Sequence, residues 1–284
     1  MMANYITGLD HAVVAVRDLD VAHAVFHRLG FALTPRGEHP EWGTANHCVM
    51  FRQDYIALQG AVGEGEVADE LRAFTAEREG LRGISLGTDN GAALVEGLAA
   101  AGLDVPLPRA LSRRIDTKEA SATLRFAETL LPPEAAPGIH TRVTQHLTAE
   151  RERFPEWLAH PNTAVGIASV TAIVAEPVEL AAAWDRLLGP HRAVITDDTV
   201  TLHTGRGLIF LTRPEELTQL HPEAELDELP APPALVSMAV LVSDLEQAAR
   251  WLDEHGVCFS RDREGTIRIP PSEACGVHLE MVRG

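Results

Sequence analysis

Apolar and polar positions along the chain form one arrangement that recurs four times. In the first copy, residues 9–16 form an apolar, β-branched run that predicts a buried strand. Asp18 or Asp20 can then cap a helix whose apolar positions keep helical spacing as far as Gly30, a residue type that often follows a helix. Three further strands are predicted at residues 31–34, 43–51 and 55–59. The pattern therefore predicts a module of one strand, one helix and three strands.

The other copies follow the same order. In the last copy, Asp244 and Gly256 stand where Asp18 and Gly30 stand in the first. The second copy opens with a strand at residues 81–86, and its later strands are predicted at 122–126 and 142–146. The third opens with a strand at 168–174. One such module cannot cover its own sheet, so we expect modules to pair side by side. The predicted fold class is α+β, with four βαβββ modules paired into two cupped mixed β-sheets.

These modules divide the chain into two predicted halves. The N-terminal half, residues 1–162, holds modules at about 7–60 and 81–148, and the C-terminal half, residues 163–284, holds modules at about 167–213 and 234–284. Residues 214–233, between the last two modules, are acidic and Pro-rich, which predicts an exposed linker. The sequence leaves open which modules pair.

Composition narrows the classes of function. A formal net charge of −17 repels nucleic acid and anionic membranes, so neither is an expected partner. No apolar run approaches the roughly 18 residues of a membrane-spanning helix, and no secretory signal pattern precedes the first module, so we expect a cytoplasmic protein. The three cysteines lack C-x-x-C spacing, which argues against a disulfide framework. No nucleotide-binding glycine motif or Gly-x-Ser-x-Gly elbow is present.

Five short segments carry a resemblance to a known family. They are Leu-Asp-His-Ala-Val at 9–13, Gly-Thr-Ala-Asn-His at 43–47, Gln-His-Leu-Thr at 145–148, Pro-Glu-Trp-Leu at 155–158 and His-Pro-Asn at 160–162. Together they resemble the glyoxalase-like domain family of the vicinal oxygen chelate superfamily. The resemblance implies the glyoxalase/bleomycin resistance/dioxygenase fold, in which paired modules surround a metal or ligand site. It also implies metal ligands on the first and last strands of paired modules.

Three histidines occupy strand positions that the resemblance marks as metal ligands. His11 lies on the first predicted strand, His47 on the third strand of the same module, and His146 on the last strand of the second module. Such donors could hold a divalent ion (Zn, Ni, Mn or Fe(II)) with open positions for substrate, and His47 or His146 could act as a general base. Each could instead be a buried histidine that hydrogen-bonds to the backbone.

The fourth strand departs from the superfamily pattern, because Ala57 stands where relatives often carry a glutamate ligand. Glu280 is the copy of Ala57 in the fourth module and joins the metal candidates. It can reach His11 only if the first and fourth modules pair; otherwise a solvated or salt-bridged glutamate is expected. His221 has no partner pattern and is expected at the surface.

Two main classes of function stay open. The first is a metal-dependent enzyme, of lyase, isomerase or ring-cleaving dioxygenase type, that binds a small oxygen-bearing substrate in the N-terminal cup. Its candidate substrate residues are Tyr55, Arg113 and Gln145; Arg113, in a predicted loop, could hold a carboxylate or phosphate. The second is a metal-free binding or drug-sequestering protein, which Ala57 and the acidic net charge favour. A pseudoenzyme is a third reading. A small molecule is the expected partner, and a homodimer is left open.

Overall fold

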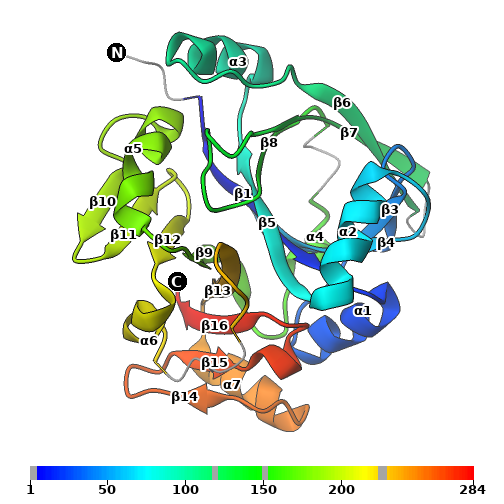
Figure 1. The fold of residues 1–284 in the computed structure, drawn as a ribbon. Helices are drawn as coiled ribbons and strands as arrows, with labels where there is room; N and C mark the ends of the chain where they lie inside the picture. The colour runs from blue at the N-terminus through cyan, green and yellow to red at the C-terminus, as the bar shows by residue number, and fades with distance from the viewer. Residues whose placement is uncertain (1–4, 117–120, 149–152, 223–228) are drawn as a thin grey trace.

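The computed structural model describes residues 5–116, 121–148, 153–222 and 229–284. Its strands form two sheets (Figure 1). The N-terminal strands close into a barrel in the order β1-β4-β3-β2-β6-β7-β8-β5, and the C-terminal strands form an eight-stranded sheet in the order β10-β11-β12-β9-β13-β16-β15-β14. The predicted α+β class of four βαβββ modules in two mixed sheets is confirmed. The N-terminal sheet differs from an open cup because it closes on itself.

The first two modules build the barrel. The first contains β1 (Gly8–Ala15), α1 (Leu19–Arg28), β2 (Gly37–His39), β3 (Thr44–Met50) and β4 (Tyr55–Ala61). After α2 (Glu66–Glu77), the second contains β5 (Gly80–Gly87), α3 (Gly91–Ala100), β6 (Arg109–Asp116), β7 (Ser121–Leu130) and β8 (Thr141–His146). The two modules pair through antiparallel β1 and β5. A short helix, α4 (Pro155–Leu158), leads to the C-terminal half.

The last two modules build the second sheet. The third contains β9 (Ala164–Ile173), α5 (Pro177–Leu188), β10 (Ala193–Thr196), β11 (Thr199–His203) and β12 (Leu208–Thr212). A 3₁₀ turn (Pro214–Glu216) and α6 (Leu217–Leu220) follow. The fourth contains β13 (Ala234–Val242), α7 (Leu245–Glu254), β14 (Ser260–Arg261), β15 (Ile267–Ile269), a 3₁₀ turn (Pro271–Glu273) and β16 (His278–Arg283). These modules pair through antiparallel β9 and β13.

The helix boundaries of the first and fourth modules follow the sequence signals. The Asp18 side chain accepts hydrogen bonds from two backbone N–H groups in the first turn of α1, and Asp244 accepts one in the first turn of α7. Gly30 and Gly256 follow these helices with φ of 87° and 63°, a region that glycine enters without steric cost. No helix in the described part of the chain is long and apolar enough to cross a membrane.

Two predicted details of the barrel are wrong. No strand covers residues 31–34, and β2 lies a few residues later at Gly37–His39. Arg113 lies not in a loop but on β6, which pairs with β2 and β7 and thereby closes the barrel. The strand was hidden in the sequence because Arg113 takes a buried position between Leu111 and Ile115 and interrupts the alternation of apolar and polar residues.

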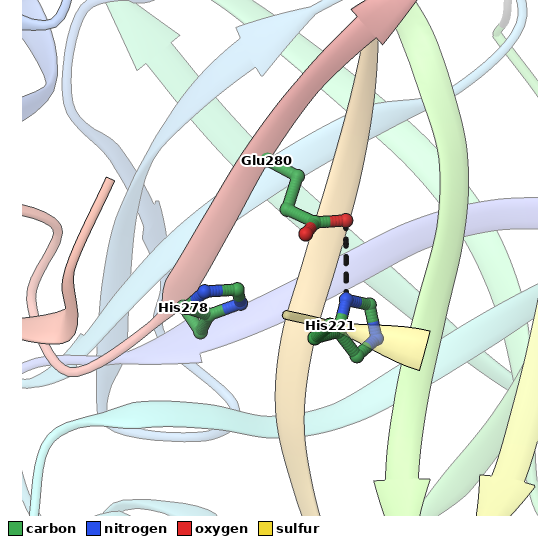
Figure 2. A group of neighbouring side chains, drawn as sticks. All are labelled: His221, His278 and Glu280. Atoms are coloured by element: carbon green, nitrogen blue, oxygen red, sulfur yellow. Dashed lines mark ion pairs between the residues drawn. The ribbon is translucent and has the colours of Figure 1, made fainter. Parts of the chain in front are cut away.

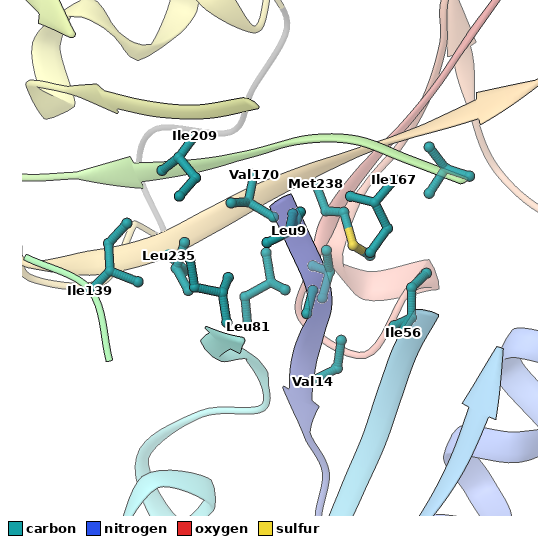
Figure 3. Packing of buried hydrophobic residues seen from close by; sticks show 14 of the residues in the cluster. Leu9, Val14, Ile56, Leu81, Ile139, Ile167, Val170, Ile209, Leu235 and Met238 are labelled. Carbon is teal, nitrogen blue, oxygen red and sulfur yellow. The ribbon is translucent and has the colours of Figure 1, made fainter. Parts of the chain in front are cut away.

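One apolar core spans both halves. Leu9 and Val14 of β1 belong to the same buried cluster as Val170 of β9 and Met238 of β13 (Figure 3). The barrel strands contribute to this core the side chains that point away from the barrel axis. The alternate side chains along each strand, such as His11, line the inside of the barrel. The barrel is therefore apolar on this outer side, whereas polar and apolar side chains are mixed within it.

Polar contacts also join the two halves. The Asp54 carboxylate accepts a hydrogen bond from the backbone N–H of Ile167 at 3.0 Å. The side-chain amide of Asn162 donates to the carbonyl of Leu29 at 2.9 Å, and the His160 ring lies 3.0 Å from a backbone carbonyl of β3. Burial raises the pKa of Asp54 to about 6, with the nearby charge of Asp10 as a smaller contribution in the same direction. The crossover segment is thus fixed by side chains that bond to backbone.

Candidate functional site

The barrel interior carries four of the side chains that the sequence marked as candidates. His11 on β1, Tyr55 on β4 and His146 on β8 face inward, together with Arg113 on β6. They line a narrow cavity of about 50 Å³. The His11 and Tyr55 rings stack with their centroids 4.3 Å apart.

Asp10 joins two of the predicted metal ligands to each other. The register of β1 against β5 shifts between Leu9 and His11, and Asp10 lies in this bulge. One carboxylate oxygen lies 2.7 Å from His11 Nδ1, and the other lies 3.0 Å from His146 Nε2. Burial alone would raise the pKa of Asp10, but the hydrogen bonds from both histidines outweigh it and hold that pKa well below its usual range. His11 and His146 therefore share a carboxylate of the chain itself.

Two other predicted residues do not reach the barrel interior. Asn46 faces inward, so the next residue on β3, His47, faces outward. Its Nδ1 lies 2.9 Å from the Thr34 carbonyl, and its ring packs edge-on against His23 of α1. Gln145 bonds through its side-chain amide to two backbone groups at the N-terminal end of α3. His47 and Gln145 thus have structural contacts outside the cavity, and neither can contact a ligand there.

A second group of donors lies in the C-terminal half. Glu280 and His278 are two residues apart on β16 and share one face, and His221, directly after α6, lies against them (Figure 2). Their ligand atoms all lie within 4.8 Å of one another. The three residues are 6%, 7% and 4% exposed in that order. Among the described residues, this is the group that brings three such donors together.

This placement corrects two expectations. Glu280 does not approach His11, because the fourth module pairs with the third and not with the first. His221 is buried rather than at the surface, because α6 folds back over the sheet instead of continuing as an exposed linker. The middle of the predicted linker, residues 223–228, lies outside the described residues.

Two hydroxyl groups orient the histidine rings. Thr171 Oγ1 on β9 lies 2.8 Å from His221 Nε2, and Ser237 Oγ on β13 lies 3.1 Å from His278 Nδ1. Each hydroxyl contacts one ring nitrogen of its histidine, so the other ring nitrogen is directed toward the remaining two donors. Hydroxyl or carbonyl partners of this kind commonly fix the tautomer and orientation of metal-binding histidines.

The Glu280 carboxylate is held from two sides. Arg268 Nε donates to Oε1 at 3.0 Å, and Arg268 also pairs with Asp262 at 2.8 Å. His221 Nδ1 lies 3.1 Å from Glu280 Oε2 and pairs with it (Figure 2). A buried carboxylate in contact with one imidazole and close to a second is a donor set that fits a divalent metal.

A larger cavity opens beside these donors. It has a volume of about 420 Å³ and is lined by His221 and His278, within the range of about 300–1,000 Å³ that is typical of ligand pockets. Arg17 and Arg78 of the N-terminal half also line it. Gly276 packs against the backbone carbonyl of Glu79 so closely that a Cβ would overlap it. The N-terminal half therefore forms one wall of the C-terminal cavity.

The sequence contained a signal for one of the two missed histidines. His278 and Glu280 lie on a strand that the sequence predicts, and their spacing of two places them on one face. His221 has no such signal, because no periodic pattern surrounds it. Only the path of α6 brings it to the sheet.

The two cupped module pairs define a protein of the vicinal oxygen chelate class. Within that class, residues 9–188 match the glyoxalase-like domain family. This match covers well over half of the chain, and the chain belongs to that family. A comparison with curated proteins finds no match.

Solved structures share the fold at low sequence identity. A hypothetical protein from Staphylococcus aureus has a TM-score of 0.70 and 12% identity over 97% of this chain and 99% of its own. A mutant 4-hydroxymandelate synthase from Streptomyces coelicolor has a TM-score of 0.59 and 13% identity, over 98% of this chain and 92% of its own. A xylose isomerase-like TIM barrel/4-hydroxyphenylpyruvate dioxygenase fusion protein has a TM-score of 0.56 and 13% identity, over 99% of this chain and 49% of its own. The similarity covers both sheets.

Proposed function

We propose that this protein is a metal-dependent enzyme whose metal centre lies in the C-terminal sheet, with His221, His278 and Glu280 as the protein ligands. The observation that carries the proposal is the convergence of these three buried donors within 4.8 Å of one another. The cavity of about 420 Å³ beside them gives a substrate room to approach. A metal site in the N-terminal cup has less support, because His11 and His146 bond to Asp10 and His47 faces away.

The donor set favours iron(II). Two histidines and one carboxylate, with positions left open, are typical of non-haem Fe(II) oxygenases. The names of two structural neighbours, a 4-hydroxymandelate synthase and a 4-hydroxyphenylpyruvate dioxygenase fusion protein, point the same way. When bound, the ion would supply Lewis-acid and oxygen-activating chemistry. We therefore propose an oxygenase-type reaction.

The side chains around the donors have separate roles in this proposal. Thr171 and Ser237 hold the two imidazoles in place, and Arg268 orients the Glu280 carboxylate. Arg17 and Arg78 outnumber Glu79 in the cavity wall, and this excess of positive charge favours a substrate with an acidic group. Apolar residues of the same wall exclude water from the bound substrate; these are Leu217, Leu229 and Val236.

Metal binding tests the proposal directly. The protein is reconstituted with Fe(II) under anaerobic conditions, and its metal content and thermal unfolding are measured. We expect one ion per chain and a higher Tm in the presence of the metal. Loss of a residue that only orients a metal ligand lowers metal affinity by roughly 10–100-fold. Glu280→Gln and His278→Gln should each lower it by more, because they remove a ligand.

His203→Gln is the matched control, because His203 lies exposed on β11 of the same sheet. It should bind the metal as the wild type does. If the wild type takes up no metal, or if Glu280→Gln binds it equally well, the proposed metal enzyme is wrong. The metal-free binding protein of the same fold then becomes the better reading.

A further inference from the structure

We propose that the N-terminal barrel is a second binding site, separate from the C-terminal donors, for a small hydroxycarboxylate anion held by Arg113 and Asn46. Both side chains line the barrel cavity. Each also has a buried polar atom that lacks a hydrogen-bond partner among the described residues: Arg113 Nε and Asn46 Oδ1.

Arg113 is a buried cation without an ion pair to any described residue. It is 7% exposed, and it donates from Nη2 to the Thr34 hydroxyl at 3.1 Å. No ion pair of Arg113 is found in the described part of the chain. Since a buried charge without a partner is strongly unfavourable, an anion in the cavity would remove a cost that the empty barrel carries.

The other arginines of the cavity wall differ from Arg113. Arg142 donates to Glu128 at 3.1 Å, and Arg82 pairs with Glu70 at 2.5 Å. His39, which also lines the cavity, does not compensate Arg113 either. Burial, followed by the charge of Arg113, lowers the pKa of His39 to about 3, so this imidazole is neutral at physiological pH.

Arg113 and Asn46 require different hydrogen-bond partners on a ligand. The Arg113 guanidinium requires an acceptor with negative charge, and a carboxylate fits its planar donors. Asn46 is 6% exposed, and its Oδ1 accepts hydrogen bonds, so it requires a donor such as a hydroxyl. One small molecule with a carboxylate and a hydroxyl satisfies both, whereas water alone leaves the charge of Arg113 uncompensated.

The size of the cavity limits the ligand. Its volume is about 50 Å³, where one water needs about 10–15 Å³. That space suits an acid of a few heavy atoms and excludes the bulkier substrates that the C-terminal cavity can take. Trp42 and Phe126 provide an apolar rim around the polar groups.

Isothermal titration of protein treated with a chelator tests the barrel site alone, because the C-terminal donors then hold no metal. Glycolate is the probe, acetate lacks its hydroxyl, and ethylene glycol lacks its charge. We expect saturable binding of glycolate, about tenfold weaker binding of acetate, and none of ethylene glycol. Glu280→Gln should bind glycolate as the wild type does, so the outcome does not depend on the proposed metal enzyme.

Variants assign the binding to Arg113. Arg113→Met should abolish glycolate binding, whereas Arg114→Gln, a change on the exposed outer face of the same strand, should not. Gly37→Ala is a second test, because a Cβ on Gly37 would overlap Arg113 Nε and displace the guanidinium. If wild-type protein does not bind glycolate, or if Arg113→Met and Gly37→Ala bind it as tightly as the wild type, the proposal is overturned.

Discussion

The two halves of this protein repeat the same module pair, yet they place their polar side chains in different surroundings. The N-terminal strands close into a barrel whose interior is nearly filled and leaves a cavity of about 50 Å³. The C-terminal strands stay open, and a cavity of about 420 Å³ lies beside their buried donors. Closure of about eight strands leaves an interior just wide enough for side chains. The barrel interior therefore leaves much less room for a substrate than the cavity beside the open sheet.

The hydrogen-bond partners of the histidines also differ between the closed barrel and the open sheet. In the barrel, His11 and His146 are close enough to Asp10 to share its carboxylate. In the open sheet, His221 and His278 bond to hydroxyl groups and direct their remaining nitrogens toward Glu280. The first arrangement resembles a hydrogen-bonded structural cluster, and the second leaves donors for an added ion.

The largest expected contrast concerns the buried arginines of the two halves. In protein without metal, Arg268→Met should lower the free energy of unfolding by about 4 kcal/mol, because Glu280 and Asp262 lose their shared cation. Arg113→Met should leave stability unchanged or raise it, because it removes a buried charge that has no ion pair among the described residues. Chemical unfolding measures both. Equal losses of stability in the two variants would contradict the contrast.

The barrel interior should also lose stability in acid. The pKa of His39 falls to about 3 on folding, while its ordinary value is 6.5. Between these values the unfolded chain holds one more proton, so stability falls as the pH drops, by an amount on the order of 3 kcal/mol for this residue. His39→Gln should flatten the stability profile over this range. An unchanged profile would mean that His39 takes up its proton in the folded barrel.

A smaller effect of opposite sign is expected where the halves meet. The pKa of Asp54 is raised to about 6 by burial, so the folded protein holds an extra proton above the ordinary value of 3.8. This contribution favours folding in acid and is lost as the pH rises through about 6. Asp54→Asn keeps an acceptor for the Ile167 N–H and should stabilise the protein at neutral pH by about 2 kcal/mol. This gain in stability should vanish as the pH falls to 3.8, the ordinary pKa of an aspartate. Thermal unfolding at several pH values measures the change.

The repeated elements were predictable because their signals are local. The capping residues Asp18 and Asp244 and the glycines that follow both helices lie where the sequence places them. β6 was not predictable, because the buried Arg113 interrupts its apolar pattern beside the exposed Arg114, and two adjacent arginines resemble a loop. His47 was assigned to the wrong face because alternation fixes which residues share a face of β3 but not which face lies inside.

By itself, the sequence determined the module and its fourfold repetition, because strand and helix periodicity and turn residues act over short stretches of chain. The family followed from the resemblance of short segments and not from that periodicity. Only the tertiary structure decided which modules pair and which sheet closes. Those choices depend on long-range packing of apolar faces, such as those of β1 and β9, that no local pattern records. They separated Glu280 from His11 and brought it to His278 and to His221, a residue from a connector that carries no periodic signal.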